Sequence, residues 1–102
     1  MFIESKVFTL KEGYAEEFAK KFSKGEKIKQ AEGFVEIIVM KRVRKGENEE
    51  LIVMTRWEDQ KAYTSWKNSD AHKAGHAQKK EKPDFIVNVK MDTYTVEGFN
   101  SK

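Results

Sequence analysis

Two histidines, His72 and His76, are the side chains best suited to chemistry in this sequence, which contains no cysteine. The lack of thiols excludes disulfide frameworks, thiolate nucleophiles, zinc–thiolate sites and iron–sulfur clusters. A metal would therefore need histidine or carboxylate ligands. The spacing of four residues places both imidazoles on one face of a helix, where such a pair can hold one metal ion. The alternative interpretation is a pair of surface histidines with no metal.

A tryptophan, Trp66, stands ten residues before His76. The small residues beside His76 on the predicted helix are Ala71, Ala74, Gly75 and Ala77. They leave room for a flat ligand to approach the histidine, and a planar haem fits that description. The alternative for Trp66 is an aromatic core residue that fills space between a helix and a sheet.

Four strands are predicted to position these residues. They are indicated by β-branched and aromatic runs at residues 2–10, 34–40, 51–57 and 85–92, the last of them alternating apolar and polar side chains. The turn at residues 45–48 joins the second and third runs into a hairpin. An apolar stripe of Tyr14, Phe18 and Phe22 predicts a helix that Gly25 ends.

Two further helices are predicted before the last strand. The pair Glu58-Asp59 offers an N-cap for a helix through Trp66, and Asn68 or Ser69 can cap a second helix to about Lys80, which Pro83 ends. The resulting order, β-α-β-β-α-β, is that of the α+β ferredoxin-like fold, an antiparallel sheet with helices on one face. We expect two copies to cover the other face, giving a homodimer that forms a dimeric α+β barrel.

The composition indicates one domain at residues 1–102 and a small core. Of the 102 residues, 38% are hydrophobic and 36% are charged, and the formal net charge is +3.

We expect a cytoplasmic protein with no membrane partner, because there is neither a secretory leader nor an apolar run of membrane-spanning length. No nucleic-acid partner is expected, since no basic-glycine-aromatic strand motif is present.

Three segments carry a resemblance to a known family. They are Glu32-Gly33-Phe34, Thr55-Arg56-Trp57 and the run AYTSWKNSD at 62–70 that leads to KAGH at 73–76. Over nearly the whole chain the sequence resembles the Isd-type haem-degrading monooxygenases of the antibiotic-biosynthesis-monooxygenase superfamily. The resemblance implies an oxidoreductase that opens the porphyrin of haem with dioxygen and releases iron. Haem is then both substrate and cofactor, and electrons come from an external reductase or small reductant.

The resemblance also implies roles for individual residues. His76 corresponds to the axial ligand of the haem iron, and Trp66 to the residue that presses on the macrocycle from the distal side. Phe22 corresponds to a residue that lines the haem pocket. His72 matches no catalytic residue of the family, which suggests a surface or pocket-rim position near a propionate.

Lys6 departs from the family pattern, because it occupies the catalytic position of an asparagine whose amide hydrogen-bonds dioxygen. A protonated lysine is a donor only, and burying it is costly unless an anion is nearby. Lys6 therefore either turns outward, or assists through its ammonium group, or leaves oxygen activation impaired.

Two other functions fit the same fold. One is a cofactor-independent monooxygenase of quinols or other aromatics, which the Lys6 departure leaves open. The other is a non-catalytic protein that carries or senses haem. Fold alone does not separate these functions.

Overall fold

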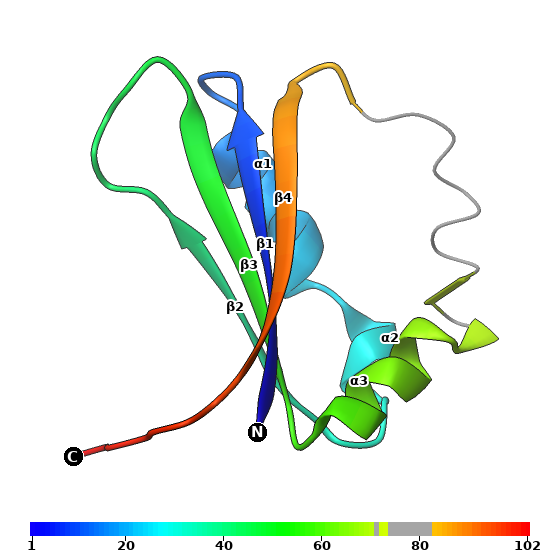
Figure 1. Ribbon diagram of the computed structural model, residues 1–102. Coiled ribbons are helices and arrows are strands. Elements are labelled where there is room, and N and C mark those ends of the chain that lie inside the picture. Colours follow the sequence, from blue (N-terminus) through cyan, green and yellow to red (C-terminus); the bar gives the residue numbers. More distant parts are fainter. Residues whose placement is uncertain (71, 74–82) are drawn as a thin grey trace.

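The computed structural model describes residues 1–70, 72–73 and 83–102. In this described part of the chain, four strands and three helices follow one another (Figure 1). They are β1 (Phe2–Leu10), α1 (Ala15–Ser23), α2 (Glu26–Lys29), β2 (Phe34–Lys41), β3 (Glu49–Trp57), α3 (Gln60–Lys67) and β4 (Ile86–Thr95).

The strands form one antiparallel sheet in the order β2-β3-β1-β4. Figure 1 shows the helices on a single face of this sheet, with α1 near the end of β1 and with α2 and α3 toward the end that holds the N-terminus. This arrangement confirms the predicted α+β ferredoxin-like fold.

Alternation along β1 separates the two faces of the sheet. Phe2, Glu4, Phe8 and Leu10 are buried on the helix-covered face, and Lys6 lies half-buried among them. The intervening side chains, Ile3, Ser5, Val7 and Thr9, point to the other face, because successive residues of a strand alternate. We call this second face the open face.

The main core lies between α1 and the sheet. Its buried members are Phe8, Leu10, Ala15, Phe18, Leu51, Val53 and Ile86. Phe8 and Phe18 meet edge to face, with ring centroids 5.0 Å apart. Phe18 and Phe22 of the predicted stripe therefore face the sheet, whereas Tyr14 is exposed at the N-cap, before the first residue of the helix.

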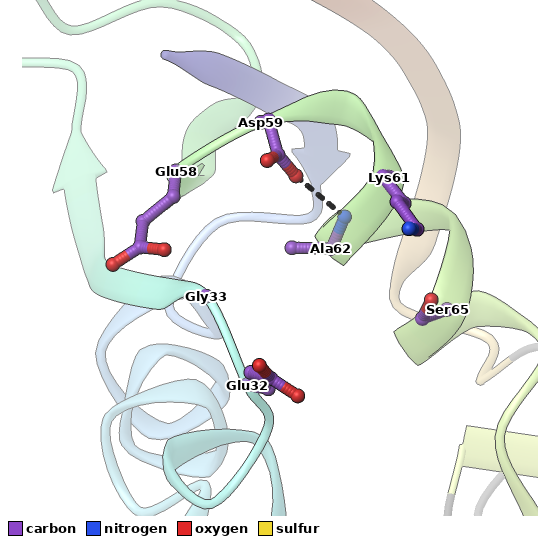
Figure 2. Close-up of a pocket in the computed structure, with 7 residues that line it drawn as sticks. All are labelled: Glu32, Gly33, Glu58, Asp59, Lys61, Ala62 and Ser65. Atoms are coloured by element: carbon purple, nitrogen blue, oxygen red, sulfur yellow. Dashed lines mark hydrogen bonds between the residues drawn. The ribbon is translucent and has the colours of Figure 1, made fainter.

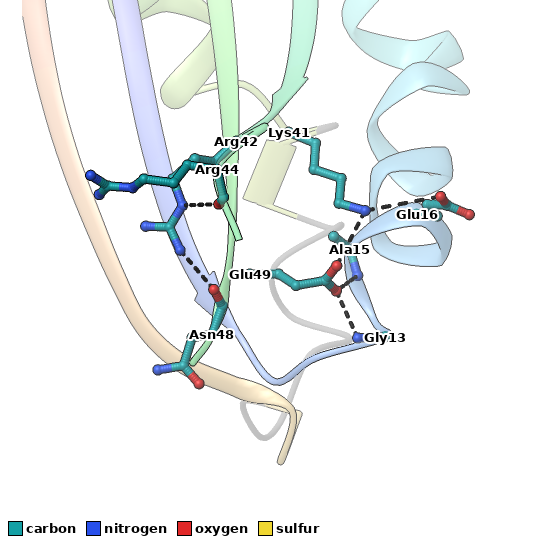
Figure 3. A network of polar contacts seen from close by, with 8 residues as sticks. All are labelled: Gly13, Ala15, Glu16, Lys41, Arg42, Arg44, Asn48 and Glu49. Atoms are coloured by element: carbon teal, nitrogen blue, oxygen red, sulfur yellow. Dashed lines mark hydrogen bonds and ion pairs between the residues drawn. The ribbon is translucent and has the colours of Figure 1, made fainter. Parts of the chain in front are cut away.

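A carboxylate from β3 completes the start of α1. Tyr14 stands at the N-cap position and makes no side-chain capping hydrogen bond. Glu49 Oε1 instead accepts hydrogen bonds from the backbone N–H groups of Gly13, at 2.8 Å, and Ala15, at 3.0 Å (Figure 3). Lys41 Nζ lies 3.2 Å from the other carboxylate oxygen. This network joins the helix to the hairpin.

Two local features differ from the sequence predictions. The four-residue helix α2 was not predicted, because Gly25 was interpreted only as the end of α1, whereas it is the N-cap of α2. In β4 a register shift places Ile86 opposite Leu10, and Ile86 is buried. The predicted alternation then holds from Asn88 to Asp92, although Val89 and Met91 are exposed rather than half-buried.

The segment after α3 is described only at its start. Ser69 Oγ accepts a hydrogen bond from the backbone N–H of His72 at 3.2 Å, which agrees with the predicted cap at Ser69. The rest of the predicted second helix, with His76, lies outside the described residues. Among the helices that the structure describes, none combines the length and apolar character needed to cross a membrane.

Candidate functional site

Helix α3 carries Trp66, and its start is fixed by the predicted cap. The Asp59 carboxylate accepts a hydrogen bond from the backbone N–H of Ala62 at 2.8 Å (Figure 2). This bond satisfies one of the free N–H groups at the helix start. The position of Trp66 is thus linked to the end of β3.

Gly33 explains why the Glu32-Gly33-Phe34 element suits this fold. Gly33 has a φ of +82°, and a Cβ atom there would lie 2.4 Å from the Cβ of Ala62. Its carbonyl also accepts a hydrogen bond from the backbone N–H of Glu58 at 2.8 Å. Only glycine combines this backbone conformation with so close an approach of α3.

Two hollows lie along the exposed side of α3. One, of about 310 Å³, is shown in Figure 2 and is lined by Glu32, Gly33, Glu58, Asp59, Lys61, Ala62 and Ser65. This lining has three carboxylates and one lysine, and its net negative charge makes the hollow unsuited to an anionic ligand. The other, of about 480 Å³, is lined by Lys27, Gln30, Ala31, Glu32, Ala62, Ser65, Trp66 and Ser69. Its volume is in the usual range for small-molecule sites.

Trp66 has both of the environments that its sequence position suggested. Its ring packs against the buried Trp57, with centroids 6.5 Å apart, and meets His72 at 5.6 Å. The same side chain is half-buried and lines the larger hollow. Trp66 is therefore anchored on the core and also available to a ligand in that hollow.

Of the two histidines, the structure describes His72 but not His76. His72 is half-buried, and its Nδ1 lies 3.1 Å from the carbonyl oxygen of Lys67. Its ring lies beside that of Trp66. A position at the rim of the haem pocket stays a prediction for His72. His76 lies outside the described residues, so its role as iron ligand stays a prediction. Among the side chains that are described, no cluster of three or more His, Cys, Asp or Glu residues could hold a metal ion.

Phe22 belongs to the main core. Its ring centroid lies 5.5 Å from that of Phe8 and 5.1 Å from that of Phe18. Among the described aromatic rings, Trp66 instead contacts Trp57 and His72. A pocket-lining role for Phe22 stays a prediction.

Lys6 lies on the helix-covered face, so it does not turn to the open face. Its side chain is 26% exposed, and its Nζ is 3.9 Å from Glu4 Oε1. The anion that a half-buried lysine requires is thus present two residues away on the same strand. Its cross-strand neighbour on β4 is Met91, an exposed apolar side chain on the same face.

Glu4 is the centre of a polar cluster between β1 and α3 that the sequence analysis did not identify. Its side chain is only 9% exposed, and its Oε2 accepts a hydrogen bond from the Tyr63 hydroxyl and lies 3.6 Å from Lys67 Nζ. Burial, together with the bond to Glu4 and its negative charge, raises the pKa of Tyr63 well above its usual range. The available signal was the spacing of Tyr63 and Lys67, which places both on one face of α3.

Comparison with known proteins identifies the family. The family model for antibiotic biosynthesis monooxygenases matches residues 1–78. The chain belongs to the antibiotic biosynthesis monooxygenase family. A relative in Bacillus subtilis, the haem-degrading monooxygenase HmoA, is 38% identical over 101 residues, which cover 96% of this chain and 93% of HmoA. These relationships make the protein an oxidoreductase.

Three further comparisons follow, of which the first two support the same family and the third shows the same fold. A staphylobilin-producing haem oxygenase of Staphylococcus haemolyticus is 43% identical over 76 residues, 74% of this chain and 73% of that enzyme. A crystal structure from Bacillus cereus, assigned to the same family, has a TM-score of 0.88 and 35% identity, covering 99% of this chain and 97% of that one. The haem degrader MhuD of Mycobacterium tuberculosis, with two haems bound, shares the fold at a TM-score of 0.74 and 22% identity, covering 99% of this chain and 100% of MhuD.

Proposed function

We propose that the protein is a haem-degrading monooxygenase. The observation that carries this proposal is the 38% identity to HmoA over 96% of the chain. The staphylococcal haem oxygenase, 43% identical over a shorter span, supports the same substrate. Dioxygen is the co-substrate, and electrons come from an external reductase or small reductant.

The described residues suit haem as a ligand. Trp66 offers a large aromatic surface at a hollow of about 480 Å³. Haem also carries two propionates, for which Lys27 at the same hollow is a cationic partner. Apolar surface with a few charged groups is the usual composition of a cofactor site.

The residues have distinct tasks in this proposal. His76 would hold the haem iron through its imidazole. Trp66 presses on the porphyrin from the opposite side, and Phe22 borders the pocket. The bound haem supplies the oxygen-activating iron, while the chain orients it and excludes water.

Hemin titration tests the function directly. We expect a Soret band of histidine-bound haem on addition of hemin. Ascorbate under air, with catalase present to remove free peroxide, should then bleach that band and release iron to a ferrous chelator. A stable band would instead indicate a haem carrier or sensor, and no binding would favour a cofactor-independent oxidation of quinols or other aromatics.

Two variants test the residue assignments. His76→Ala should remove the histidine-ligated Soret signature and abolish turnover, and His72→Ala is the matched control that should keep both. Trp66→Phe should keep hemin binding but slow degradation, because a smaller ring presses less on the porphyrin. Ring opening in His76→Ala at the unchanged rate would contradict the ligand assignment.

We also propose that two copies of the chain pair through the open face. Half-buried apolar side chains of this face lie on the three adjacent strands β2, β3 and β1: Ile3, Val7, Ile38, Ile52 and Met54. A continuous aliphatic surface of this kind is typical of an interface. Pairing of the two sheets gives the dimeric α+β barrel expected from the sequence.

The mass in solution tests this pairing. Sedimentation at micromolar concentration should give the mass of two chains. Ile52→Glu, at the centre of the open face, should give the mass of one chain because an unpaired carboxylate would be buried. Val43→Glu is the control, since Val43 is 95% exposed in the connection between β2 and β3. A monomer in the unchanged protein would overturn the proposal.

A further inference from the structure

A third hollow lies beside α1, at the end of the sheet opposite to α3. Its volume is about 390 Å³, within the usual range for small-molecule sites. Phe85, which borders it, precedes the pairing of Ile86 with Leu10 at the end of β1, whereas Tyr63 of α3 packs against Phe2 at the start of that strand. The residues that line this α1 hollow line neither of the two hollows along α3. It is therefore a separate feature of the described part of the chain.

Three aromatic rings form an apolar wall of the α1 hollow. Tyr14 and Phe85 are stacked, with ring centroids 4.7 Å apart and an angle of 3° between the ring planes. Phe18 meets Phe85 edge to face, with centroids 5.4 Å apart. Because Tyr14 is 47% exposed, part of its ring surface is accessible from the hollow. A further flat ring can therefore pack against this wall, since offset and edge-to-face contacts between aromatic rings are favourable.

The position of Tyr14 in the helix gives no other reason for an exposed aromatic ring. Tyr14 stands at the N-cap of α1, which Ser, Thr, Asp or Asn usually fills, and its side chain makes no capping hydrogen bond. Glu49 supplies the acceptor at this helix start instead. The ring of Tyr14 thus contributes to the wall of the hollow rather than to the helix start.

Lysines give the α1 hollow a net positive charge. Its charged lining residues are Glu17 and three lysines, Lys20, Lys21 and Lys24. Lys20 Nζ lies 3.1 Å from Glu17 Oε1, whereas in the described part of the chain neither Lys21 nor Lys24 makes an ion pair. Lys21 Nζ lies 5.9 Å from the centroid of the Phe18 ring. An ammonium group is therefore held over the aromatic wall, where it can pair with an anionic group of a ligand.

We propose that the α1 hollow binds a small aromatic acid, a molecule of one or two fused rings that carries a carboxylate. The flat ring packs against the exposed side of Tyr14, and the carboxylate pairs with Lys21 and Lys24. An uncharged aromatic molecule would match only the wall, and an inorganic anion would match only the lysines. The site is independent of the proposed haem function, because none of these contacts involves haem.

Competition for a fluorescent aromatic anion tests the binding. Anilinonaphthalene sulfonate should bind to the full chain without hemin, and naphthoate should displace it. Naphthamide has the same two rings without the charge, and it should compete about tenfold more weakly, the size of one lost charged contact. Equal competition by the acid and the amide would overturn the proposal, and so would a failure of naphthoate to displace the probe.

Variants locate the bound acid. Lys21→Gln should weaken naphthoate affinity about tenfold, and Tyr14→Ser about fivefold because the stacking surface is lost. Lys29→Gln is the matched control, since this exposed lysine of α2 lines none of the three hollows, and it should leave the affinity unchanged. Unchanged affinity in Lys21→Gln, or a loss in Trp66→Phe instead, would overturn the proposal because the acid would then lie elsewhere.

Two further measurements separate this site from a folding defect and from the haem pocket. Far-UV circular dichroism of Lys21→Gln and Tyr14→Ser should match that of the unchanged protein. Saturating naphthoate should leave the Soret titration with hemin unchanged, and competition between the two would overturn the proposal, since the hollow would then be part of the haem pocket. If the protein binds no hemin, the proposed function fails, while the naphthoate competition still decides this site.

Discussion

Two glutamates lie on the helix-covered face of the sheet, near its opposite ends, and they are held in different ways. Glu49 pairs across the strands with Leu10 and accepts hydrogen bonds from the backbone N–H groups of Gly13 and Ala15. Glu4 is held by side chains alone, Tyr63 and two lysines. A carboxylate that is hydrogen-bonded to backbone N–H groups holds a helix in place. A carboxylate that is hydrogen-bonded or ion-paired to titratable side chains instead controls the position and charge of those side chains.

The electrostatic consequences of the two sites also differ. At Glu49 the backbone N–H of Ala15, together with Lys41 and the N–H of Gly13, lowers the pKa of the carboxyl, although burial acts in the opposite direction. In the cluster around Glu4, burial of the Tyr63 hydroxyl and its bond to the negatively charged Glu4 raise the pKa of Tyr63. The stability contribution of the Glu49 site should therefore change at acid pH, and that of the Glu4 site at alkaline pH.

Removing the Glu49 carboxylate should have the largest effect on stability. Glu49→Ala leaves the start of α1 without its acceptor, and we expect the free energy of unfolding to fall by about 2 kcal/mol. Urea unfolding followed by circular dichroism measures this loss, with Glu47→Ala in the exposed turn as control. Hemin turnover per folded molecule should stay unchanged. A loss of turnover per folded molecule in Glu49→Ala would remove the distinction between the two sites.

Acid should act on the protein through Glu49. Because its folded pKa is below the unfolded value, its contribution to stability is present above the unfolded pKa and is lost as the pH falls through the folded pKa. The free energy of unfolding, measured from pH 6 down to about 2, should fall less steeply in Glu49→Gln than in the unchanged protein. Equal slopes would mean that other carboxylates carry the acid response.

Alkali should act through Tyr63. Its folded pKa is above the unfolded value, so its contribution is present below the unfolded pKa of about 10 and is lost as the pH rises above it. Tyr63→Phe should flatten this alkaline loss and cost about 1 kcal/mol at neutral pH, since the hydroxyl bond is lost while the ring contacts with Phe2 and Trp57 stay. A steeper alkaline loss in the variant would be evidence against the shift.

The smallest effect is expected at Lys41. Its Nζ lies 3.2 Å from Glu49 and 4.0 Å from Glu16, but its side chain is 45% exposed. Lys41→Gln should therefore lower the free energy of unfolding by less than about 1 kcal/mol, and by less still in high salt. A loss as large as that of Glu49→Ala would show that the ion pair, rather than the backbone hydrogen bonds, holds α1.

The strands could be predicted from the sequence because alternation and β-branched runs are local properties. The start of α3 was predictable for the same reason, since Asp59 caps it within three residues. The helix α2 was missed, because four residues carry too little periodicity to indicate a helix. In β4 the register shift depends on pairing with β1, which a local pattern does not contain.

The candidate site was predictable only in part. Trp66 stood out by its spacing, and the structure places it at a hollow. Glu4 did not stand out, because a charged residue in a strand of mixed pattern is usually solvent-facing. Only the placement of α3 over β1 brings Tyr63 and Lys67 to Glu4. The hydrogen bond between Tyr63 and Glu4 joins residues that are 59 positions apart in the sequence.

The contact between Gly33 and Ala62 predicts how this family can vary. A side chain at position 33 would meet the Cβ of Ala62 at 2.4 Å, so the two positions are sterically coupled. Neither can gain volume unless α3 shifts, and a shift of α3 would carry Trp66, one turn further along, with it. Related chains should therefore change positions 33 and 62 together or not at all, and an exchange at this pair would alter the width of the hollow that Trp66 lines.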